Sequence, residues 1–402
     1  MRGCAASYSN QKLAETHPIV TVTRKGEDRI ESGHPWIFSS DVTGRGAAQP
    51  GDAVRVVNAR GRSLGTAHYS STSQITLRML SRRTEPIDGA FFRERIRRAA
   101  AHRERVVDDS DSMRLVHAEG DLLPGLIVDR YADCLSVQLL DQGMDRAAGD
   151  ITPALVELFA PRSIVARNDV AVRKHENLPL ESKVLHGEEP GRVEIRFNGL
   201  RWLVEPLAGQ KTGVYLDQRE NYRAAARYAH GRALDCFTST GGFALHLAGC
   251  CDSVEAVDSS AAALELAKAN AALNGVGTIE FREANVFDLL AGLASSQRQY
   301  DTIVLDPPAF AKSKSSRDAA GRGYKEINYK ALKMLSPGGV LVTCSCSHHF
   351  SEADLLETVA EAALDAGRTL RVLERRTQAA DHPILLTVPE TLYLKCLIFQ
   401  AM

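Results

Sequence analysis

Two cysteines at the end of an apolar run are the residues whose chemistry most needs explaining. The stretch LVTCSCSHHF, residues 341–350, contains Cys344 and Cys346. Side chains alternate along a strand, so both thiols are expected on one face. Their spacing is too short for the usual CxxC metal site, and eight cysteines in 402 residues lack a disulfide framework. We therefore expect reduced thiols and no metal in a cytoplasmic protein, with Cys344 in the core and Cys346 as a nucleophile.

A thiolate at the end of a strand suits methyl transfer to carbon 5 of a pyrimidine. That carbon is a poor nucleophile until a thiolate adds at carbon 6 and makes the ring enamine-like. Asp306, in LDPPAF, ends the neighbouring predicted strand. We expect its carboxylate to bind N3 and the amino edge of cytosine and to offset the charge that develops on the ring. The sequence does not identify the base that removes the carbon 5 proton.

A glycine-rich turn and a series of polar strand ends predict a nucleoside cofactor. The stretch DCFTSTGGFALHLA, residues 235–248, has Gly241 and Gly242 just before a helix, where a ligand can approach the backbone closely. Asp258 ends the next strand and is expected to bind both ribose hydroxyls. Asn285 follows the third strand and is expected at the adenine edge. The GxGxxG pyrophosphate fingerprint is missing, which favours S-adenosylmethionine over NAD.

These residues need a parallel sheet to bring them together. After about Leu200, the predicted strands RALDCF, SVEAVD, TIEFRE, YDTIVLD and GVLVTCSC alternate with helices. Three of these helices are predicted at Ala261–Leu273, near Tyr324–Met334 and at Ser351–Ala366. Such alternation predicts an α/β fold with helices on both faces and ligands at the carboxyl ends of the strands.

Two smaller domains are predicted ahead of this sheet. Residues 1–18 are expected to be a flexible leader, and 19–84 a small β-barrel that begins with the strand IVTVTR. Residues 85–199 are expected to form a central α+β domain that ends in a hairpin with Asn198-Gly199 at its turn. Residues 200–402 then form the Rossmann-like cofactor-binding domain.

Composition leaves the partner open. The formal net charge of −1 argues mildly against nucleic acid, but it does not report local patches. No apolar run is long enough to span a membrane, so no membrane partner is expected. Arg93 and Arg97 lie in FFRERIRRAAAHRERV, which is either a solvated helix face or an RNA phosphate contact. Trp36, Phe38 and Tyr69 are either core residues or platforms on which bases stack.

From about Ile19 to Met402 the chain resembles a known family, the RlmI-type 23S ribosomal RNA cytosine-carbon-5 methyltransferases. The similar segments are GHPWIFSSDV, LPGLIVDRY, KTGVYLDQRENY, LDPPAF, GRGYKEIN, TCSCS and QAADHPILLTVPETLYLK. The resemblance implies a class I S-adenosylmethionine-dependent methyltransferase domain, an N-terminal PUA domain that binds RNA, 23S rRNA as substrate and a homodimer.

The resemblance also assigns roles to single residues. Cys346 is the nucleophile. The residues implied to hold the cofactor and the target base are Phe237, Ser239, Gly241, Gly242, Asp258, Asn285 and Asp306. Those implied near the methionine end of the cofactor are Lys211, Thr212, Tyr215 and Asp217. Larger RNA cytosine methyltransferases carry a second cysteine where Ala309 follows Pro308 here. Their two-cysteine release mechanism therefore does not transfer, and another base or water is expected to serve.

Three functions stay open at this point. The first is formation of 5-methylcytidine in 23S rRNA. The second is methylation of an exocyclic amine, because a DPP-aromatic run also marks such enzymes and they need no thiol. The third is an rRNA-binding assembly factor with an inactive catalytic fold. Loss or survival of activity in Cys346→Ala separates the first two, and binding of S-adenosylmethionine separates both from the third.

Overall fold

The computed structural model describes residues 17–207, 214–296, 298–310 and 317–402. The chain divides into two compact units. Among the described residues, the first comprises 17–193, 205–207 and 380–391, and the second 194–204, 214–296, 298–310, 317–379 and 392–402. Within the described ranges, no helix is both long and apolar enough to cross a membrane.

The first unit begins with a six-stranded sheet in the order β2-β6-β5-β4-β1-β3. Its elements are β1 (Ile19–Val22), α2 (Arg24–Glu31), β2 (Trp36–Phe38), β3 (Val42–Gly44), β4 (Ala53–Val57), β5 (Ser63–Tyr69) and β6 (Ile75–Ser81). The strand predicted through Arg24 ends earlier, because the Thr23 side chain accepts a hydrogen bond from the backbone N–H of Gly26 and begins α2.

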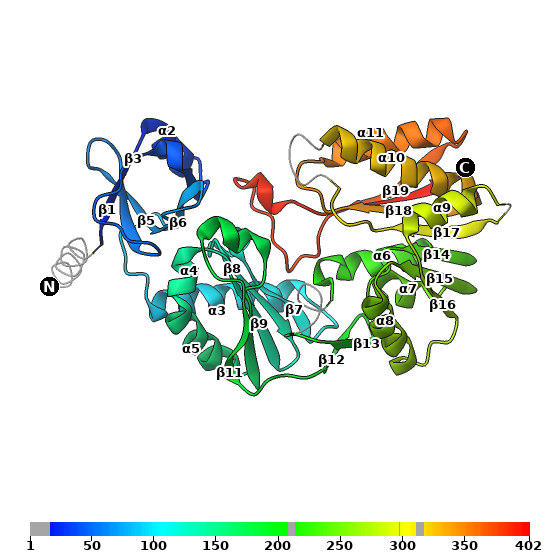
Figure 1. The fold of residues 1–402 in the computed structure, drawn as a ribbon, viewed down its shortest axis with the longest axis horizontal. Helices are drawn as coiled ribbons and strands as arrows, with labels where there is room; N and C mark the ends of the chain where they lie inside the picture. The colour runs from blue at the N-terminus through cyan, green and yellow to red at the C-terminus, as the bar shows by residue number, and fades with distance from the viewer. Residues whose placement is uncertain (1–16, 208–213, 297, 311–316) are drawn as a thin grey trace. The chain divides into compact units, whose positions relative to one another are not determined.

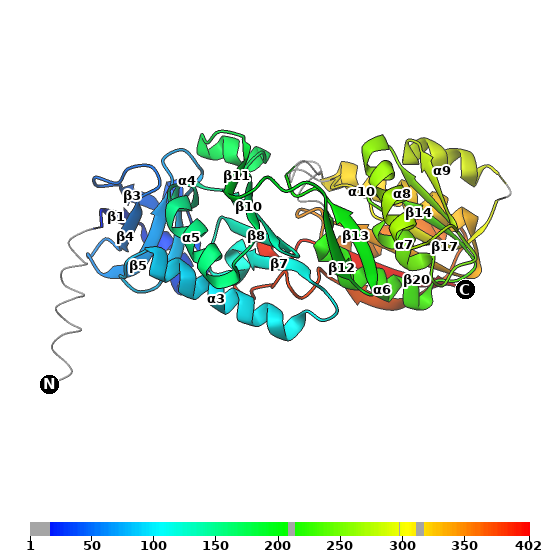
Figure 2. The ribbon, with the colours of Figure 1, turned by 90° about the horizontal axis from the view of Figure 1, so that it is seen from below.

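A second sheet in this unit has the order β11-β10-β9-β8-β7. Its elements are α3 (Gly89–Val106), β7 (Ser112–His117), β8 (Leu126–Tyr131), β9 (Cys134–Leu139), α4 (Gln142–Arg146), α5 (Ala148–Phe159), β10 (Ser163–Arg167) and β11 (Ser182–Gly187). Helices α3 and α5 lie side by side against the sheet (Figure 1 and Figure 2). The core between them includes Phe92, Ile96 and Leu155, so the arginine-rich helix buries an apolar stripe.

A hairpin opens the second unit. Its strands are β12 (Val193–Phe197) and β13 (Leu200–Val204). Asn198 and Gly199 have φ angles of 53° and 73°, which confirms the predicted turn with two left-handed residues. Trp202 is fully buried and stacks on Phe197 with ring centroids 4.7 Å apart.

The main sheet of the second unit has seven strands in the order β16-β15-β14-β17-β18-β20-β19. They are β14 (Arg232–Cys236), β15 (Ser253–Asp258), β16 (Ile279–Glu283), β17 (Tyr300–Leu305), β18 (Leu335–Ser345), β19 (Leu370–Arg376) and β20 (Lys395–Ala401). The five predicted strands are parallel, whereas β20 runs antiparallel to both β18 and β19. The order reverses direction between β14 and β17, where open α/β sheets bind their ligands.

Helices cover both faces of this sheet, as predicted. They are α6 (Arg219–Tyr228), α7 (Gly242–Leu247), α8 (Ala261–Leu273), α9 (Val286–Ala294), α10 (Arg317–Met334) and α11 (Glu352–Asp365). Helices α6, α7 and α8 lie on one face and α9, α10 and α11 on the other (Figure 1). The predicted limits of α8 are confirmed, and Ser351 and Ala366 are the caps of α11.

The predicted start of α10 near Tyr324 is wrong, because the helix is already present from Arg317. Gly323 hides this extension in the sequence, since glycine disfavours a helix interior. A Cβ at Gly323 would lie 3.2 Å from the Phe310 ring, and Phe310 in turn packs on Tyr324. Tight packing of these rings therefore outweighs the low helix propensity.

Candidate active site

The register of the parallel strands brings the predicted site residues to one edge of the sheet. Cys236, the last residue of β14, is paired with Val257 of β15 and with Leu305 of β17. Asp258 and Asp306 come directly after these two partners. Both carboxylates therefore lie at the carboxyl ends of neighbouring strands, on either side of β14.

The turn after β14 holds its backbone in an unusual conformation. Phe237 and Ser239 have φ angles of 65° and 51°, and Gly241 has a φ of 91°. Positive φ is uncommon for residues other than glycine, and it costs free energy that the surroundings must supply. Thr238 donates its backbone N–H to the carbonyl of Val257 at 3.0 Å, which ties the turn to β15. Strain held in this way is typical of a ligand-binding loop.

Asp258 is fixed by two backbone hydrogen bonds. The N–H of Ser239 donates to its Oδ2 and the N–H of Ser260 to its Oδ1, each at 2.9 Å. Each carboxylate oxygen keeps a further lone pair. The group is half-buried. It is suited to accept hydrogen bonds from two vicinal hydroxyls, as expected for ribose.

Asp235 is a buried carboxyl group that the sequence analysis missed. Its Oδ2 accepts hydrogen bonds from Thr238 Oγ1 at 2.6 Å and from the backbone N–H of Ala244 at 2.9 Å. Its Oδ1 is buried without a partner among the described residues. Burial raises the pKa of Asp235 to about 7, against the hydrogen bond from Thr238. An acid inside the apolar strand RALDC was the sequence signal for this residue.

Glycine is needed at positions 241 and 242 of the turn for two different physical reasons. Gly241 needs its positive φ. A Cβ at Gly242 would lie 2.5 Å from the hydroxyl oxygen of Tyr222, so the missing side chain makes room for that ring. Tyr222 also packs edge-on against Phe243, with ring centroids 4.7 Å apart. The group that approaches Gly242 closely is therefore the Tyr222 ring of the protein itself. A contact between the cofactor and the backbone of Gly242 stays a prediction.

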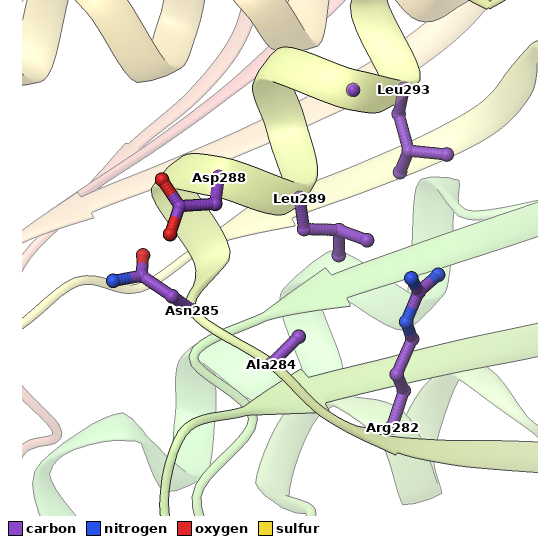
Figure 3. Close-up of a pocket in the computed structure, with 7 residues that line it drawn as sticks. Arg282, Ala284, Asn285, Asp288, Leu289 and Leu293 are labelled. Atoms are coloured by element: carbon purple, nitrogen blue, oxygen red, sulfur yellow. The ribbon is translucent and has the colours of Figure 1, made fainter.

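Asn285 begins α9 and is exposed. Its Oδ1 accepts a hydrogen bond from the backbone N–H of Phe287 at 2.9 Å, which leaves its amide N–H groups for a ligand. A shallow pocket of about 350 Å³ adjoins it. Figure 3 shows Asn285 at the start of the helix and Arg282 across the pocket, with Leu289 and Leu293 on the same side of the helix as the pocket. Asp258 and Asp306 do not line this pocket.

Of the residues predicted near the methionine end of the cofactor, Tyr215 and Asp217 are described. Lys211 and Thr212 lie outside the described residues. Asp217 Oδ2 accepts a hydrogen bond from the hydroxyl of Tyr393 at 2.7 Å. The carbonyl of Tyr215 accepts one from the hydroxyl of Tyr222 at 3.3 Å. Burial raises the pKa of Tyr222 well above its usual range, and the nearby charges of Asp306 and Asp217 add to this effect.

Asp306 is oriented by a glutamine that the sequence analysis did not single out. Gln218 donates from its Nε2 to Asp306 Oδ2 at 3.1 Å. Asn221 donates in turn to the Oε1 of Gln218 at 2.7 Å, which fixes the orientation of that amide. The backbone N–H of Asp306 bonds to the carbonyl of Cys236 at 3.3 Å. The carboxylate therefore has a set direction at the end of β17.

The two cysteines of the opening motif have different surroundings. Cys344 is fully buried opposite Cys396 of β20, and burial raises its pKa well above the usual range. Cys346 follows the end of β18 and is only partly buried. All cysteines in the described ranges are free, and no group of described side chains is arranged to hold a metal ion. Cys346 is thus the accessible thiol of the pair.

Comparison with known proteins identifies the family. A PUA-like domain model matches residues 20–82, and an S-adenosylmethionine-dependent methyltransferase model matches residues 114–400. The chain is 43% identical over 387 residues to Ribosomal RNA large subunit methyltransferase I of Shewanella denitrificans, covering 93% of this chain and 97% of that protein. It is 44% identical over 392 residues to the protein of that name from Tolumonas auensis, covering 95% and 99%.

The chain belongs to the ribosomal RNA large subunit methyltransferase I family. Solved structures agree with this fold. A methyltransferase complexed with SAH has a TM-score of 0.83 at 19% identity, covering 95% of this chain and 100% of that one. An S-adenosylmethionine-dependent methyltransferase from Streptococcus mutans has a TM-score of 0.81 at 19% identity, with the same coverage. The predicted PUA and methyltransferase domains are confirmed.

The strand ends of this methyltransferase fit S-adenosylmethionine, the cofactor of its family. Asp258 has two carboxylate oxygens with further acceptor capacity, and the amide of Asn285 has N–H donors, so both stay predicted contacts for ribose and for the adenine edge. The unpartnered, buried Oδ1 of Asp235 is an acceptor suited to a cationic ligand. Asp258 was predicted from its place after a strand, whereas Asp235 required the three-dimensional contacts.

The predicted arginines lie on the exposed face of α3 of the methyltransferase. Arg93 is 3.0 Å from a carboxylate oxygen of Glu157, and Arg97 is 2.9 Å from one of Glu94. Exposed ion pairs contribute little to stability because water and salt screen them, so a phosphate can compete for these guanidinium groups. Both residues stay predicted RNA contacts.

The predicted stacking residues are partly committed to internal contacts. Trp36 is half-buried, and its Nε1 donates to a carboxylate oxygen of Glu119 at 2.8 Å. Tyr69 is buried in the sheet core. The guanidinium of Arg29 lies 4.8 Å from the centroid of the Phe38 ring. Trp36 keeps part of its ring accessible and stays the predicted platform.

Proposed function

We propose that this protein methylates carbon 5 of a cytidine in 23S rRNA, with Cys346 as the nucleophile. Support for the RNA comes from relatives named Ribosomal RNA large subunit methyltransferase I, which match over nearly their full length. Support for carbon 5 rests on one observation: a partly exposed thiol follows β18, beside the strand that ends at Asp306. An enzyme that methylates an amine has no use for such a thiol.

The chain's own groups carry the covalent steps of the proposed mechanism. S-adenosylmethionine, held by Asp258 and the 237–241 turn, would supply an electrophilic methyl group, and S-adenosylhomocysteine would be the leaving group when the methyl–sulfur bond breaks. The Cys346 thiolate forms a bond to carbon 6 of the cytosine, and the ring electrons move to carbon 5, which takes the methyl group. Asp306, oriented by Gln218, accepts a hydrogen bond from the exocyclic amino group and, in its protonated form, donates one to N3, which offsets the negative charge that thiolate addition places there. Loss of the carbon 5 proton to a base restores the ring and breaks the carbon–sulfur bond.

The target base must leave its stack before these steps. Extrusion costs a few kcal/mol, and less where the nucleotide already lies in a loop. We propose that Arg93, Arg97 and Trp36 hold the RNA through backbone phosphates and one stacked base. Arg97→Gln is then expected to weaken RNA binding and to reduce the dependence of affinity on salt, because one phosphate contact is lost. Filter binding between about 50 and 200 mM salt measures this slope, and an unchanged slope would remove Arg97 from the interface.

A second function, methylation of an exocyclic base amine, is favoured by Asp306-Pro307-Pro308 at the end of β17. The buried Pro307 and then the exposed Pro308 follow Asp306, as in enzymes that hold an amino group with this motif. That chemistry does not need Cys346, so the two functions make opposite predictions for its removal.

The deciding experiment compares wild type with Cys346→Ala. Tritium-methyl S-adenosylmethionine and 23S rRNA from a strain lacking the enzyme are the substrates, and mass spectrometry of nucleosides identifies the product. We expect 5-methylcytidine from wild type and none from Cys346→Ala. Transfer that survives the substitution, or that gives an N-methylated base, would overturn the carbon 5 mechanism.

Cys344→Ala is the matched control. It removes a thiol from the same strand two residues earlier, at a site that is fully buried. Its activity is expected to stay close to wild type at a temperature where both variants are folded. Equal loss in both variants would point to damage of β18 rather than to loss of a nucleophile.

A further inference from the structure

Lys395 is a buried cation that the proposed mechanism leaves unused. It begins β20 and is 4% exposed. Its Nζ donates to the carbonyl oxygens of Ser347 at 2.7 Å and of Tyr393 at 2.9 Å. In the part of the chain that the structure describes, no carboxylate lies within ion-pair distance of it. An ammonium buried without a counter-charge is costly, so its retention needs a reason.

The position of Lys395 connects it to the candidate nucleophile. Strands β18 and β20 are antiparallel, and Ser345 is paired with Lys395 at the end of the ladder. The carbonyl that accepts the shorter bond belongs to Ser347, the residue directly after Cys346. Ser347 is further held by its backbone N–H, which donates to Ser345 Oγ at 3.3 Å. The ammonium thus lies against the short turn that carries the thiol.

The charges around Lys395 indicate what it can do. Burial lowers its pKa to about 8, and the negative charges of a Cys346 thiolate and of Asp354 act in the opposite direction. Asp354 is already held by the guanidinium of Arg317 and by the backbone N–H of Ser351. Lys395 therefore stays protonated at neutral pH, and a Cys346 thiolate is one of the two negative charges that act on it.

The other titratable groups around the turn come from several elements. Tyr324 of α10 places its hydroxyl 3.1 Å from Ser347 Oγ, and burial raises its pKa. The rings of His348 and Tyr393 lie 5.8 Å apart, and Tyr393 donates to Asp217. Asp306 at the end of β17 adds a negative charge, and the buried thiols of Cys344 and Cys396 lie further along the ladder.

We propose that Lys395 is a positioning residue for methyl transfer: it fixes the Ser345–Ser347 turn through the carbonyl of Ser347, and its charge stabilises the Cys346 thiolate. The inference rests on the proposed function, because it gives the thiolate a role. The coupling is reciprocal: the free energy by which the thiolate stabilises the protonated ammonium equals the free energy by which the ammonium stabilises the thiolate. A cation beside a cysteine is an established way to increase the fraction of thiolate at neutral pH.

The test is the pH dependence of thiol alkylation in the full-length protein. Iodoacetamide labelling between pH 6 and 9.5, followed by peptide mass spectrometry, gives separate rates for Cys346 and for the exposed Cys250. In Lys395→Met we expect the Cys346 midpoint to rise by at least about one pH unit, with labelling at pH 7 about tenfold slower. Lys395→Arg, which keeps the charge, is expected to stay near wild type.

Several outcomes would overturn the inference. One is an unchanged Cys346 midpoint in Lys395→Met, and another is an equal rise in Lys395→Arg, because the charge would then be irrelevant. Cys250 is the internal control, and its rate is expected to be the same in all variants. If Lys395→Met fails to fold, Lys395→Gln retains amide protons for the two carbonyls and gives the same comparison.

Activity supplies a second readout. The acid limb of the plot of kcat against pH is expected to shift to higher pH in Lys395→Met. The curve is expected to meet that of wild type at high pH, where the thiolate forms without Lys395. General structural damage would lower kcat at every pH. Labelling needs neither S-adenosylmethionine nor RNA, so it tests Lys395 independently of the reaction. Activity that survives in Cys346→Ala would refute the proposed function, whereas an unchanged labelling midpoint would refute this inference alone.

Discussion

Asp235→Asn tests whether the buried carboxyl group at the end of β14 lowers stability in order to serve the cofactor. Its pKa is about 7 in the folded protein, compared with an ordinary value of 3.8. Between these values the folded state binds more protons than the unfolded state, so the free energy of unfolding falls as pH rises. At pH 8 the ionised carboxylate then lowers the free energy of unfolding by about 4 kcal/mol, of which roughly 1–2 kcal/mol is already lost at pH 5.

Asparagine keeps an acceptor for Thr238 and Ala244 but removes the ionisation. The stability of Asp235→Asn relative to wild type is therefore expected to increase by about 2–3 kcal/mol between pH 5 and pH 8. The same variant is expected to bind S-adenosylmethionine at least about tenfold more weakly, because a neutral amide attracts a cationic ligand less. Higher stability with weaker binding is the usual trade-off at a functional site.

The assay uses a single tryptophan as reporter. The chain has two tryptophans, so Trp36→Phe leaves Trp202, which is fully buried in the second unit. Urea unfolding followed by its fluorescence at pH 5 and pH 8 gives the stability difference, and calorimetry gives cofactor affinity. Asp252→Asn, at an exposed position, is the control and is expected to show no such change with pH. Parallel stability curves for wild type and Asp235→Asn would refute the reasoning.

Two further substitutions test the geometry of the cofactor end. Asp258→Ala is expected to weaken S-adenosylmethionine binding at least about tenfold by calorimetry, because the acceptors for ribose are lost. Asp252→Ala, at an exposed position just before the start of β15, should leave binding unchanged, and equal effects would contradict the assignment. Gly242→Ala is expected to destabilise the protein by about 1–3 kcal/mol in thermal unfolding, because its Cβ meets the Tyr222 ring. Gly292→Ala, whose Cβ meets nothing within 4 Å in α9, is the control and is expected to stabilise the protein by up to about 1 kcal/mol. If Gly242→Ala were at least as stable as Gly292→Ala, the Tyr222 ring would have to move aside.

Local signals in the sequence determined much of the fold. The limits of α8 follow from its apolar spacing and from Ser260, whose side chain accepts from the backbone N–H of Ala263 at 3.3 Å. The turn at Asn198-Gly199 follows from residues that tolerate positive φ. The same local signals place Asp258 and Asp306 after strands, because hydrophobic runs and their ends can be read without knowing what packs against them.

Contacts between distant segments decided the rest. Asp235 and Lys395 became candidate site residues only when burial and hydrogen-bond partners were known; the sequence marks Asp235 only as an acid within an apolar strand and does not mark Lys395. Cys344 and Cys346 are two residues apart, yet pairing of β18 with β20 buries the first opposite Cys396, and the end of β18 leaves the second accessible. Residue type and spacing therefore determined which groups could react, whereas packing determined which of them are buried, charged and adjacent, because burial and electrostatic coupling depend on tertiary neighbours.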